Sequence, residues 1–189
     1  VRLLPDKGAV LTGGPPAFAK DEPPEIQLTG LKKRFGPKVV LDGLDLSIAR
    51  GDSIVVLGKS GAGKSVLLKH VIGLLEPDMG TVAVQGEDLW AAPPSRRDVM
   101  RRRFGMSFQE GALFDSMTVG ENVAFPLLRH TRMTPAEVRE RVAECLALVR
   151  LNGIEERRPA ELSGGMRRRV GFARAIALRP RIVLFDEPT

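Results

Sequence analysis

Residues 58–65 read GKSGAGKS, which fits the pattern G-x-x-x-x-G-K-[ST] of a phosphate-binding P-loop. An apolar run over residues 53–57 leads into this stretch, and residues 66–72 continue it with apolar positions at helical spacing. The motif requires a strand, a glycine-rich turn and a helix in this order, and the surrounding sequence supplies all three. The stretch therefore indicates an α/β fold and predicts that the chain binds a nucleoside triphosphate.

Each residue type in this loop has a physical role. Backbone N–H groups at a helix N-terminus attract phosphate oxygens. Gly58, Gly61 and Gly63 leave room for the backbone to wrap closely around a phosphate, where a Cβ would obstruct it. Lys64 is predicted to neutralise the β- and γ-phosphates, and the hydroxyl of Ser65 is predicted to ligate Mg²⁺.

Composition bounds the class of protein. A chain of 189 residues that is 43% hydrophobic suits one globular domain with a substantial core. Its one cysteine, Cys145, excludes a disulfide framework and is interpreted as a small core residue of a helix. No uninterrupted apolar run approaches the length of a membrane span, and the first residues lack the layout of a secretory signal. We therefore expect a soluble, cytosolic protein in which any membrane role requires a separate partner.

The charge of the chain does not determine what it binds. The net charge is +6, and arginines cluster at 96–97, 101–103 and 167–169. Such clusters could attract nucleic acid, anionic lipid or nucleotide phosphates, although groups of two or three arginines are more often solvated helix faces. Lys59 is likewise interpreted as a solvated loop charge. Tyrosine is absent and no aromatic residues interleave with the arginines, which disfavours a surface on which bases stack.

The order of expected elements indicates the fold class. Residues 1–25 mix proline, glycine and isolated charges without periodicity, and we expect a flexible leader. Strands are expected at 26–31, 38–41 and 44–48, before the P-loop strand and its helix. Further expected elements are a strand at 81–84, a basic helix at 95–103, a strand at 104–108, helices near 119–128, 135–151 and 163–178, and a strand at 181–185. Thr134 is the expected N-cap of the helix at 135–151, with Pro135 just inside it, and Ser163 is the expected N-cap of the last helix. Early strands followed by strand and helix alternation indicate an α/β domain with a mostly parallel sheet.

Two adjacent acids follow the last apolar strand. Residues 182–185 read IVLF and are followed by Asp186 and Glu187. In a P-loop protein, such a strand carries carboxylates to Mg²⁺ and to an attacking water. Because side chains alternate along a strand, one acid can address the metal while the other orients water. The alternative, acids that open a surface turn, is less in keeping with a P-loop in the same chain.

A second anion site is predicted at residues 162–166, which read LSGGM and open a helix. Ser163 is expected to cap this helix, and Gly164 and Gly165 leave backbone N–H groups uncovered. The alternative is an ordinary capped helix. A second phosphate site in a chain that already has one suggests that it serves the nucleotide of another copy.

The P-loop, LSGG and the strand that ends in DEPT, in this order and spacing, resemble the ATPase domain of ABC transporters from about residue 26 to residue 189. FQEGALFD at 108–115 and MTVGENVAFPL at 117–127, together with LSGGM, are similar to the ATPases of MCE-type lipid transporters, the Mla and Mkl group. The resemblance implies a P-loop NTPase fold of ABC type. That fold has a mostly parallel sheet, an antiparallel β subdomain and a helical subdomain, here at about 110–160.

The resemblance also implies MgATP hydrolysis, with ATP and Mg²⁺ as cofactors. Phe35 matches the aromatic residue that stacks on adenine, and Val40 the apolar contact beside it. Gln109 matches the glutamine that senses Mg²⁺ and relays the nucleotide state, Asp186 the Mg²⁺-associated acid and Glu187 the catalytic base. Together, the predicted ATP-binding residues are Phe35, Val40, Gly58, Ser60, Gly61, Ala62, Gly63, Lys64, Ser65, Ser163, Gly164 and Gly165; the metal is expected at Ser65, Gln109 and Asp186, and catalysis at Glu187 and Gln109.

The implied assembly is a head-to-tail pair in which Ser163 and Gly165 contact the γ-phosphate held by the opposite subunit. Closure and reopening of the pair would drive a permease. The expected partners are a second ATPase copy, a membrane permease and an MCE-domain substrate-binding protein, with phospholipid or a related apolar substrate and no nucleic acid. We expect the protein at the inner face of the cell membrane. The alternatives are a soluble ABC-type ATPase acting on nucleic acid or ribosomes, and an inactive truncated fragment.

Two features depart from the family pattern. Met166 stands where glutamine is commoner across ABC ATPases, although methionine suits the MCE-linked subgroup. Family members continue beyond DEPT with an aspartate-containing loop, a core strand and a histidine that contacts the γ-phosphate, whereas His70 and His130 both precede LSGG. A missing core strand leaves backbone groups of its neighbours unpaired. We therefore expect a C-terminally truncated domain that, by itself, folds poorly and hydrolyses little ATP.

Overall fold

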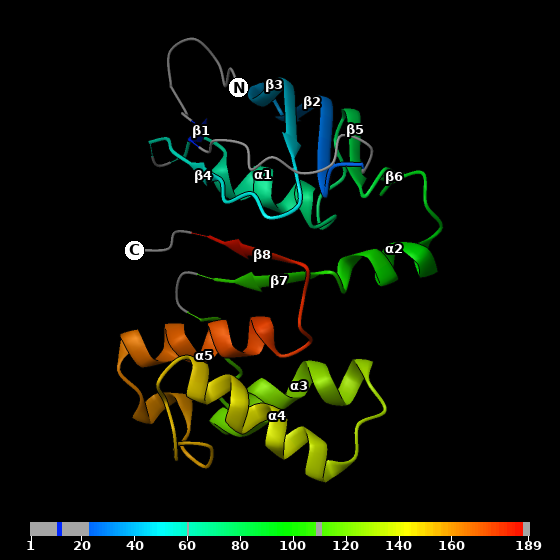
Figure 1. The fold of residues 1–189 in the computed structure, drawn as a ribbon. Helices are drawn as coiled ribbons and strands as arrows, with labels where there is room; N and C mark the ends of the chain where they lie inside the picture. The colour runs from blue at the N-terminus through cyan, green and yellow to red at the C-terminus, as the bar shows by residue number, and fades with distance from the viewer. Residues whose placement is uncertain (1–10, 13–22, 60, 109–110, 187–189) are drawn as a thin grey trace. The chain divides into compact units, whose positions relative to one another are not determined.

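The computed structural model describes residues 11–12, 23–59, 61–108 and 111–186, and Figure 1 shows the strands and helices that they form. The chain divides into two compact units, Val1–Arg101 and Arg102–Thr189, and each is described by itself. Most of the predicted leader lies outside the described residues. Ser60, Gln109 and Glu187 also lie outside them.

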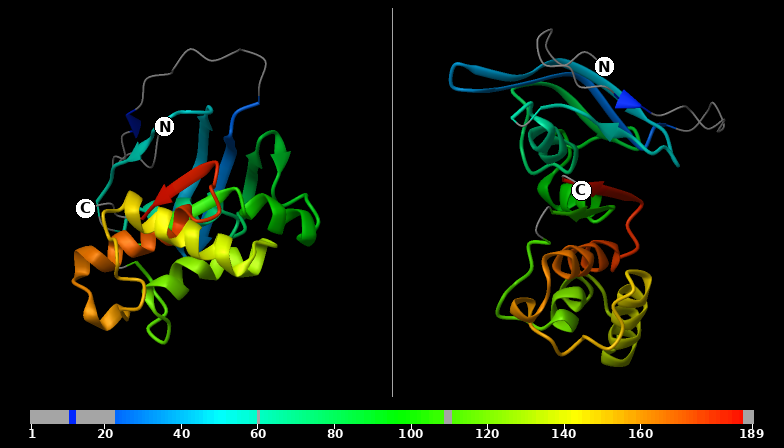
Figure 2. Two further views of the ribbon diagram at one scale, coloured as in Figure 1. Left: turned by 60° about the horizontal axis from the view of Figure 1, so that its bottom comes forward. Right: turned by 90° about the vertical axis from the view of Figure 1, so that its left-hand side faces the viewer.

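The first unit is built on a four-stranded antiparallel sheet in the order β3–β2–β5–β6 (Figure 1). This sheet matches the antiparallel subdomain that the resemblance implies. Helix α1 lies along one face of the sheet (Figure 2), and buried side chains of the helix and strands form the core of the unit. The elements are β2 (Ile26–Phe35), β3 (Lys38–Ile48), α1 (Lys64–Val71), β5 (Met79–Val84), β6 (Glu87–Asp88) and α2 (Pro94–Arg101).

The two strands predicted at 38–41 and 44–48 are one strand, β3, and the prediction of a break is wrong. Its pairing with β2 continues across the break, with Leu31 opposite Leu44 and Lys33 opposite Leu41. The register shifts here by one residue, and Gly43 has a φ of 72°. An extra residue accommodated in this way is a β-bulge, so the glycine kinks the strand without ending it.

The second unit joins a parallel strand pair to three helices that pack on one another (Figures 1 and 2). Helix α5 packs against this pair, and the rings of Phe172 and Phe185 lie 5.3 Å apart. Cys145 is fully buried in the apolar core of the helices, as predicted. The elements are β7 (Phe104–Ser107), α3 (Val119–His130), α4 (Pro135–Leu148), the short 3₁₀ helix η1 (Pro159–Glu161), α5 (Gly164–Ile176) and β8 (Ile182–Phe185).

Among the described residues, parallel pairing joins β7 and β8 only. The P-loop strand β4 (Val55–Val56) is shorter than the predicted strand at 53–57 and pairs antiparallel with β1 (Leu11–Thr12). The mostly parallel sheet is therefore represented here by one strand pair. The helical subdomain predicted at about 110–160 contains α3 and α4, and its boundaries stay a prediction. No helix in the described ranges has both the length and the apolar character needed to cross a bilayer.

Helix starts agree closely with the sequence signals. Thr134 caps α4, its side chain accepts a hydrogen bond from the backbone N–H of Glu137, and Pro135 occupies the first turn. The carboxylate of Glu137 accepts in return from the backbone N–H of Thr134 at 2.6 Å. Such a capping box satisfies backbone donors at both positions, so this helix begins where the sequence predicts.

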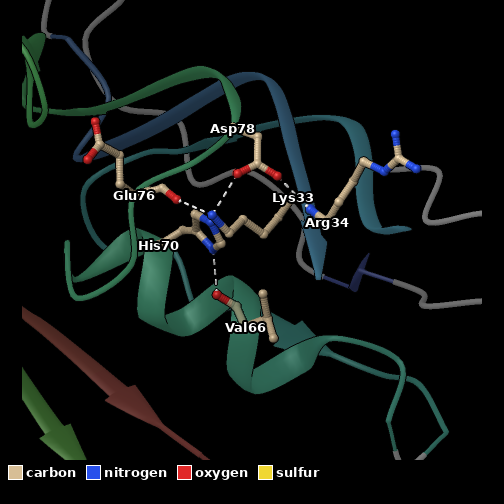
Figure 3. Close-up of polar contacts among 6 residues, drawn as sticks. All are labelled: Lys33, Arg34, Val66, His70, Glu76 and Asp78. Atoms are coloured by element: carbon tan, nitrogen blue, oxygen red, sulfur yellow. Dashed lines mark hydrogen bonds and ion pairs between the residues drawn. The ribbon is translucent and has the colours of Figure 1, made fainter. Parts of the chain in front are cut away.

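A polar cluster lies between strand β2 and the turn that follows α1 (Figure 3). The ammonium group of Lys33 donates to the carboxylate of Asp78 at 2.7 Å and to the carbonyl oxygen of Glu76 at 2.8 Å. The other carboxylate oxygen of Asp78 accepts from the backbone N–H of Arg34 at 2.7 Å. These bonds lower the pKa of Asp78. They fasten the turn after the P-loop helix to the sheet.

His70 of α1 is fully buried beside this cluster (Figure 3). Its Nδ1 lies 2.7 Å from the carbonyl oxygen of Val66, and within the described structure its Nε2 has no hydrogen-bond partner. Burial lowers the pKa of His70; the Val66 carbonyl raises it, Lys33 lowers it and Asp78 raises it, each to a smaller extent. The folded chain therefore holds this ring neutral more strongly than the unfolded chain does.

We expect this histidine to make folding sensitive to mild acid. Below about pH 6.5 the unfolded chain binds a proton at His70 that the folded chain resists, so the free energy of unfolding falls as pH falls, by at most about 1.4 kcal/mol per pH unit. Urea unfolding of the full-length protein at about pH 7.5 and about pH 5.5 measures this loss. The variant His70→Gln should lose less stability over this interval, whereas His130→Gln, at the exposed end of α3, should behave as wild type. Equal losses in all three proteins would contradict the prediction.

Candidate functional site

The P-loop connects β4 to α1 in the first unit. Gly61 and Gly63 have φ angles of 76° and 94°, which lie in the left-handed region that favours glycine. Gly63 is the N-cap of α1, and a Cβ built on it would lie 2.8 Å from a methyl carbon of Val40. The loop therefore packs against β3, and the structure places Val40, predicted beside adenine, in contact with the predicted phosphate loop.

Lys64 spans this loop. Its ammonium group donates to the carbonyl oxygen of Gly58 at 2.8 Å and to that of Lys59 at 3.3 Å. The backbone N–H of Ala62 also donates to the carbonyl oxygen of Lys59, at 3.1 Å, which closes a tight turn. Lys64 is half-buried whereas Lys59 is exposed, in keeping with the roles predicted for the two lysines.

The residues of the loop fit a nucleotide phosphate and Mg²⁺. The first turn of α1 contains no acidic residue, so nothing there repels an anion at the helix N-terminus. A side chain at Gly63 would fill the space next to Val40, which explains why the loop carries glycine there. The half-buried Ser65 supplies a hydroxyl beside Lys64. Mg²⁺ commonly takes one or two protein ligands together with phosphate oxygens and water, and this donor set suits it.

Phe35 ends strand β2 next to the turn at Gly36, and its side chain is 48% exposed. The Lys33 ammonium group lies 5.8 Å from the centroid of the ring. An exposed aromatic face of this kind is available for stacking on a planar base. Phe35 and Val40 lie on the two paired strands of one hairpin, and their contact with adenine stays a prediction.

The LSGG segment begins α5 in the second unit. Ser163 is its N-cap, as predicted, and its hydroxyl accepts a hydrogen bond from the backbone N–H of Met166 at 3.3 Å. Ser163, Gly164 and Gly165 are all exposed, and a Cβ built on Gly165 would meet no atom within 4 Å. No acidic residue lies in the first turn. This helix end is therefore open to an anion from outside.

Asp186 follows β8 at the same sheet edge where β7 ends. The backbone N–H of Asp186 donates to the carbonyl oxygen of Ser107 at 3.1 Å. Gln109 comes two residues after Ser107 in the chain, and Glu187 directly follows Asp186. The carboxyl ends of parallel strands share an edge, which is where α/β proteins place ligand-binding residues. The roles of Gln109 and Glu187 stay predictions, since both residues lie outside the described part.

Asn122 is a fully buried polar residue for which the sequence predicted no role. Its amide group accepts from the backbone N–H of Phe114 at 2.8 Å and donates to the carbonyl oxygens of Phe114 and Thr118 at 3.1 and 2.9 Å. It fixes the segment before α3 to the first turn of that helix. Asn122 lies in the stretch that resembles the MCE-linked ATPases. Its hydrogen bonds join a side chain to backbone groups, and the spacing of residues in the sequence does not reveal bonds of this kind.

A cavity of about 360 Å³ lies within the second unit, between β7, α3 and α5. Aromatic and aliphatic side chains form most of its wall, and one guanidinium group, that of Arg174, contributes charge. Its lining residues include Phe104, Met106, Phe108, Phe114, Phe125 and Leu178.

A family model described as ABC transporter matches residues 41–189. The chain belongs to the ABC transporter family. It is 47% identical over 163 residues to the probable ribonucleotide transport ATP-binding protein Mkl of Mycobacterium tuberculosis, covering 86% of this chain and 45% of that protein. It is 45% identical over 166 residues to the sulfate/thiosulfate import ATP-binding protein CysA of Bordetella pertussis, covering 86% of this chain and 46% of that protein. The chain thus spans about half the length of the curated relatives it matches.

Solved structures confirm the ABC-type fold. The ATP-binding cassette MJ0796, in a dimeric post-hydrolysis state bound to ADP and Pi, superposes with a TM-score of 0.76 at 30% identity, covering 87% of this chain and 74% of that chain. CbiO1 of Clostridium perfringens, part of the transporter complex CbiONQ, superposes with a TM-score of 0.75 at 24% identity, covering 89% and 67%. The fold class and the family expected from the sequence are confirmed.

Proposed function

We propose that this chain is the ATP-binding and ATP-hydrolysing subunit of an ABC transporter that powers a separate membrane permease. The proposal rests on one observation: in a chain of this family, Lys64 of the P-loop motif donates to the carbonyl oxygen of Gly58, and the LSGG start of α5 is exposed. The relatives named above are ATP-binding proteins of transport systems, and the similar cassette MJ0796 is known as a dimer with ADP and Pi.

The proposed reaction is in-line attack of water on the γ-phosphorus of ATP, which breaks the bond to the β–γ bridging oxygen and releases ADP and phosphate. Lys64 and the backbone N–H groups of α1 bind the phosphates, and Phe35 with Val40 contacts adenine. Glu187 accepts the proton of the attacking water. Mg²⁺ neutralises charge on the phosphate oxygens when it is bound at Ser65.

The second phosphate site serves a second copy. Ser163, Gly164 and Gly165 at the start of α5 are exposed, so they suit a nucleotide that another subunit carries. A head-to-tail pair then has two shared sites, and ATP binding closes the pair. Hydrolysis reopens it, which gives the permease two states to follow.

The finer part of the proposal is an apolar substrate, phospholipid or a related molecule, with an MCE-domain protein as a further partner. It rests on the stretches at 108–115 and 117–127 and on LSGGM. Relatives of 42–47% identity carry names that refer to ribonucleotide, sulfate/thiosulfate and Fe(3+), so identity at this level does not determine the cargo. The complex with the permease, purified in detergent, should show ATP hydrolysis that added phospholipid stimulates and ribonucleotides do not; stimulation by ribonucleotides alone would overturn this part.

The arginines of α2 and its flanks argue against the nucleic-acid alternative. Arg96 donates to Glu87 at 2.7 Å, and Arg101 pairs with Asp98 at 3.1 Å. The guanidinium of Arg97 lies 4.4 Å from the centroid of the Trp90 ring. These three side chains are engaged within their own unit, which reduces the charge that they offer to a phosphate backbone.

The deciding experiment compares MgATP hydrolysis by the full-length protein with hydrolysis by its Glu187→Gln variant. We expect hydrolysis in the wild type and its loss in Glu187→Gln, because the variant lacks the carboxylate that accepts the proton of the attacking water. Absence of Glu187-dependent hydrolysis would overturn the proposed function.

A further inference from the structure

Arg174, on the third turn of α5, binds the backbone of the segment that follows Gln109. Its Nη2 donates to the carbonyl oxygen of Gly111 at 2.9 Å and to that of Ala112 at 2.8 Å. The guanidinium also lies 5.6 Å from the centroid of the Phe114 ring. A guanidinium stays charged at neutral pH, so both hydrogen bonds are charge-assisted. One side chain therefore contacts three residues of this segment, Gly111, Ala112 and Phe114.

The backbones of the segment and the helix touch next to this arginine. A Cβ built on Gly171 would lie 2.6 Å from the Cα of Gly111, and a Cβ on Gly111 would lie 2.5 Å from the carbonyl oxygen of Arg167. Gly111 also has a φ of 79°. The segment is therefore seated directly on α5 without intervening side chains, which leaves little room for it to slide.

Helix α5 begins with the LSGG segment. A rigid helix that holds residues 111–112 three turns from its N-terminus fixes that segment relative to Ser163, and Asn122 fixes the far end of the same segment to α3. Gln109, for which the sequence predicts contact with Mg²⁺, comes two residues before Gly111 in the chain. Residues 111–112 and the LSGG segment are thus attached to the same helix.

We propose that Arg174 is a positioning residue that fixes residues 111–114, which follow Gln109 in the chain, to the LSGG helix, so that this segment and the helix respond together when nucleotide binds. This inference rests on the proposed function. The metal contact predicted for Gln109 depends on where the chain that follows it is held, and the LSGG segment predicted to contact phosphate begins the helix that holds this chain. Binding at either part is then transmitted to the other through Arg174.

Arg141 provides a matched control, because it makes the same kind of contact elsewhere on α5. It is buried in α4 and donates to the carbonyl oxygens of Ala177 and Ile176 at 2.9 and 2.8 Å. It also pairs with Glu144 at 2.7 Å. Loss of Arg141 should weaken the unit as much as loss of Arg174 does, but it leaves the segment after Gln109 seated.

The test compares Arg174→Met, Arg174→Lys and Arg141→Met in the full-length protein by amide hydrogen exchange with and without MgATP, and by steady-state kinetics. The reporters are the N–H groups of Gly111 and Phe114, which donate to Phe108 and Asn122. In Arg174→Met we expect exchange at both to rise about tenfold, with loss of the nucleotide response there but not at the start of α5. We expect kcat to fall about tenfold while the KM for ATP changes by less than about twofold, and Arg174→Lys to recover most of kcat.

The inference would be wrong if exchange at Gly111 and Phe114 were unchanged in Arg174→Met, or if Arg141→Met raised it equally. Either result would mean that Arg174 contributes only to the stability of the unit. If Arg174→Met does not fold, Arg174→Gln retains a hydrogen-bond donor and is subject to the same criteria. Absence of ATP hydrolysis in the wild type would overturn the proposed function, and the exchange data would still decide whether Arg174 seats the segment.

Discussion

Replacement of Lys64 with alanine is expected to weaken ATP binding about a hundredfold, because it removes two or more charge-assisted hydrogen bonds to phosphate. In the structure, the Lys64 ammonium group already lies over the loop, on the carbonyl oxygens of Gly58 and Lys59. Phosphate oxygens are stronger acceptors than these carbonyls and take over the same donors. Equilibrium binding of a fluorescent ATP analogue to the full-length protein measures the loss.

Lys59→Ala is the matched control, since it removes the same charge from the same loop. Lys59 is exposed, and its backbone carbonyl, which the substitution retains, is the part that contacts Lys64. Its removal should change affinity by less than about threefold, the size expected for a screened surface charge. Comparable losses in the two variants would show that the loop attracts phosphate by net charge alone, and the specific role of Lys64 would be wrong.

The parts of this site that the sequence predicts are those that depend on local pattern. The P-loop dihedrals follow from Gly61 and Gly63, and the starts of α4 and α5 follow from Thr134 and Ser163, because caps and tight turns depend on residues within a few positions. The order of the motifs then predicted the family, which the family model and the relatives confirm.

The contacts that the sequence did not predict join residues far apart in the chain. Arg174 reaches carbonyl oxygens at 111 and 112, and Arg141 reaches those at 176 and 177. Such side-chain-to-backbone bonds leave no trace in periodicity, because the acceptor is a carbonyl group that every residue possesses. The charge pattern does not show such contacts either, and from it the arginine clusters are interpreted as solvated helix faces. In α2, Arg97 instead stacks on Trp90, a contact set by the packing of its unit.

Gly105→Ala is expected to destabilise the protein by about 3 kcal/mol, near the upper end of the usual range for overpacking. Gly105 is buried in β7, and a Cβ there would overlap the carbonyl oxygen of Ala175 and lie 2.8 Å from the ring of Pro180. Because the first obstacle is backbone of α5, no rotamer change can relieve it. The helix must move away from β7 as a whole, which also disturbs the Phe172 contact with Phe185.

Urea unfolding of the full-length protein measures this effect against Gly165→Ala, which adds the same methyl group to α5 where no atom lies within 4 Å. That control should change the free energy of unfolding by less than about 1 kcal/mol, since alanine is the better helix former and meets no neighbour. A loss in Gly105→Ala no larger than in the control would show that α5 can shift on β7 at little cost. Helix α5 would then be only loosely attached to β7, the strand that precedes Gln109 in the chain, so this measurement also tests the rigidity on which the role proposed for Arg174 depends.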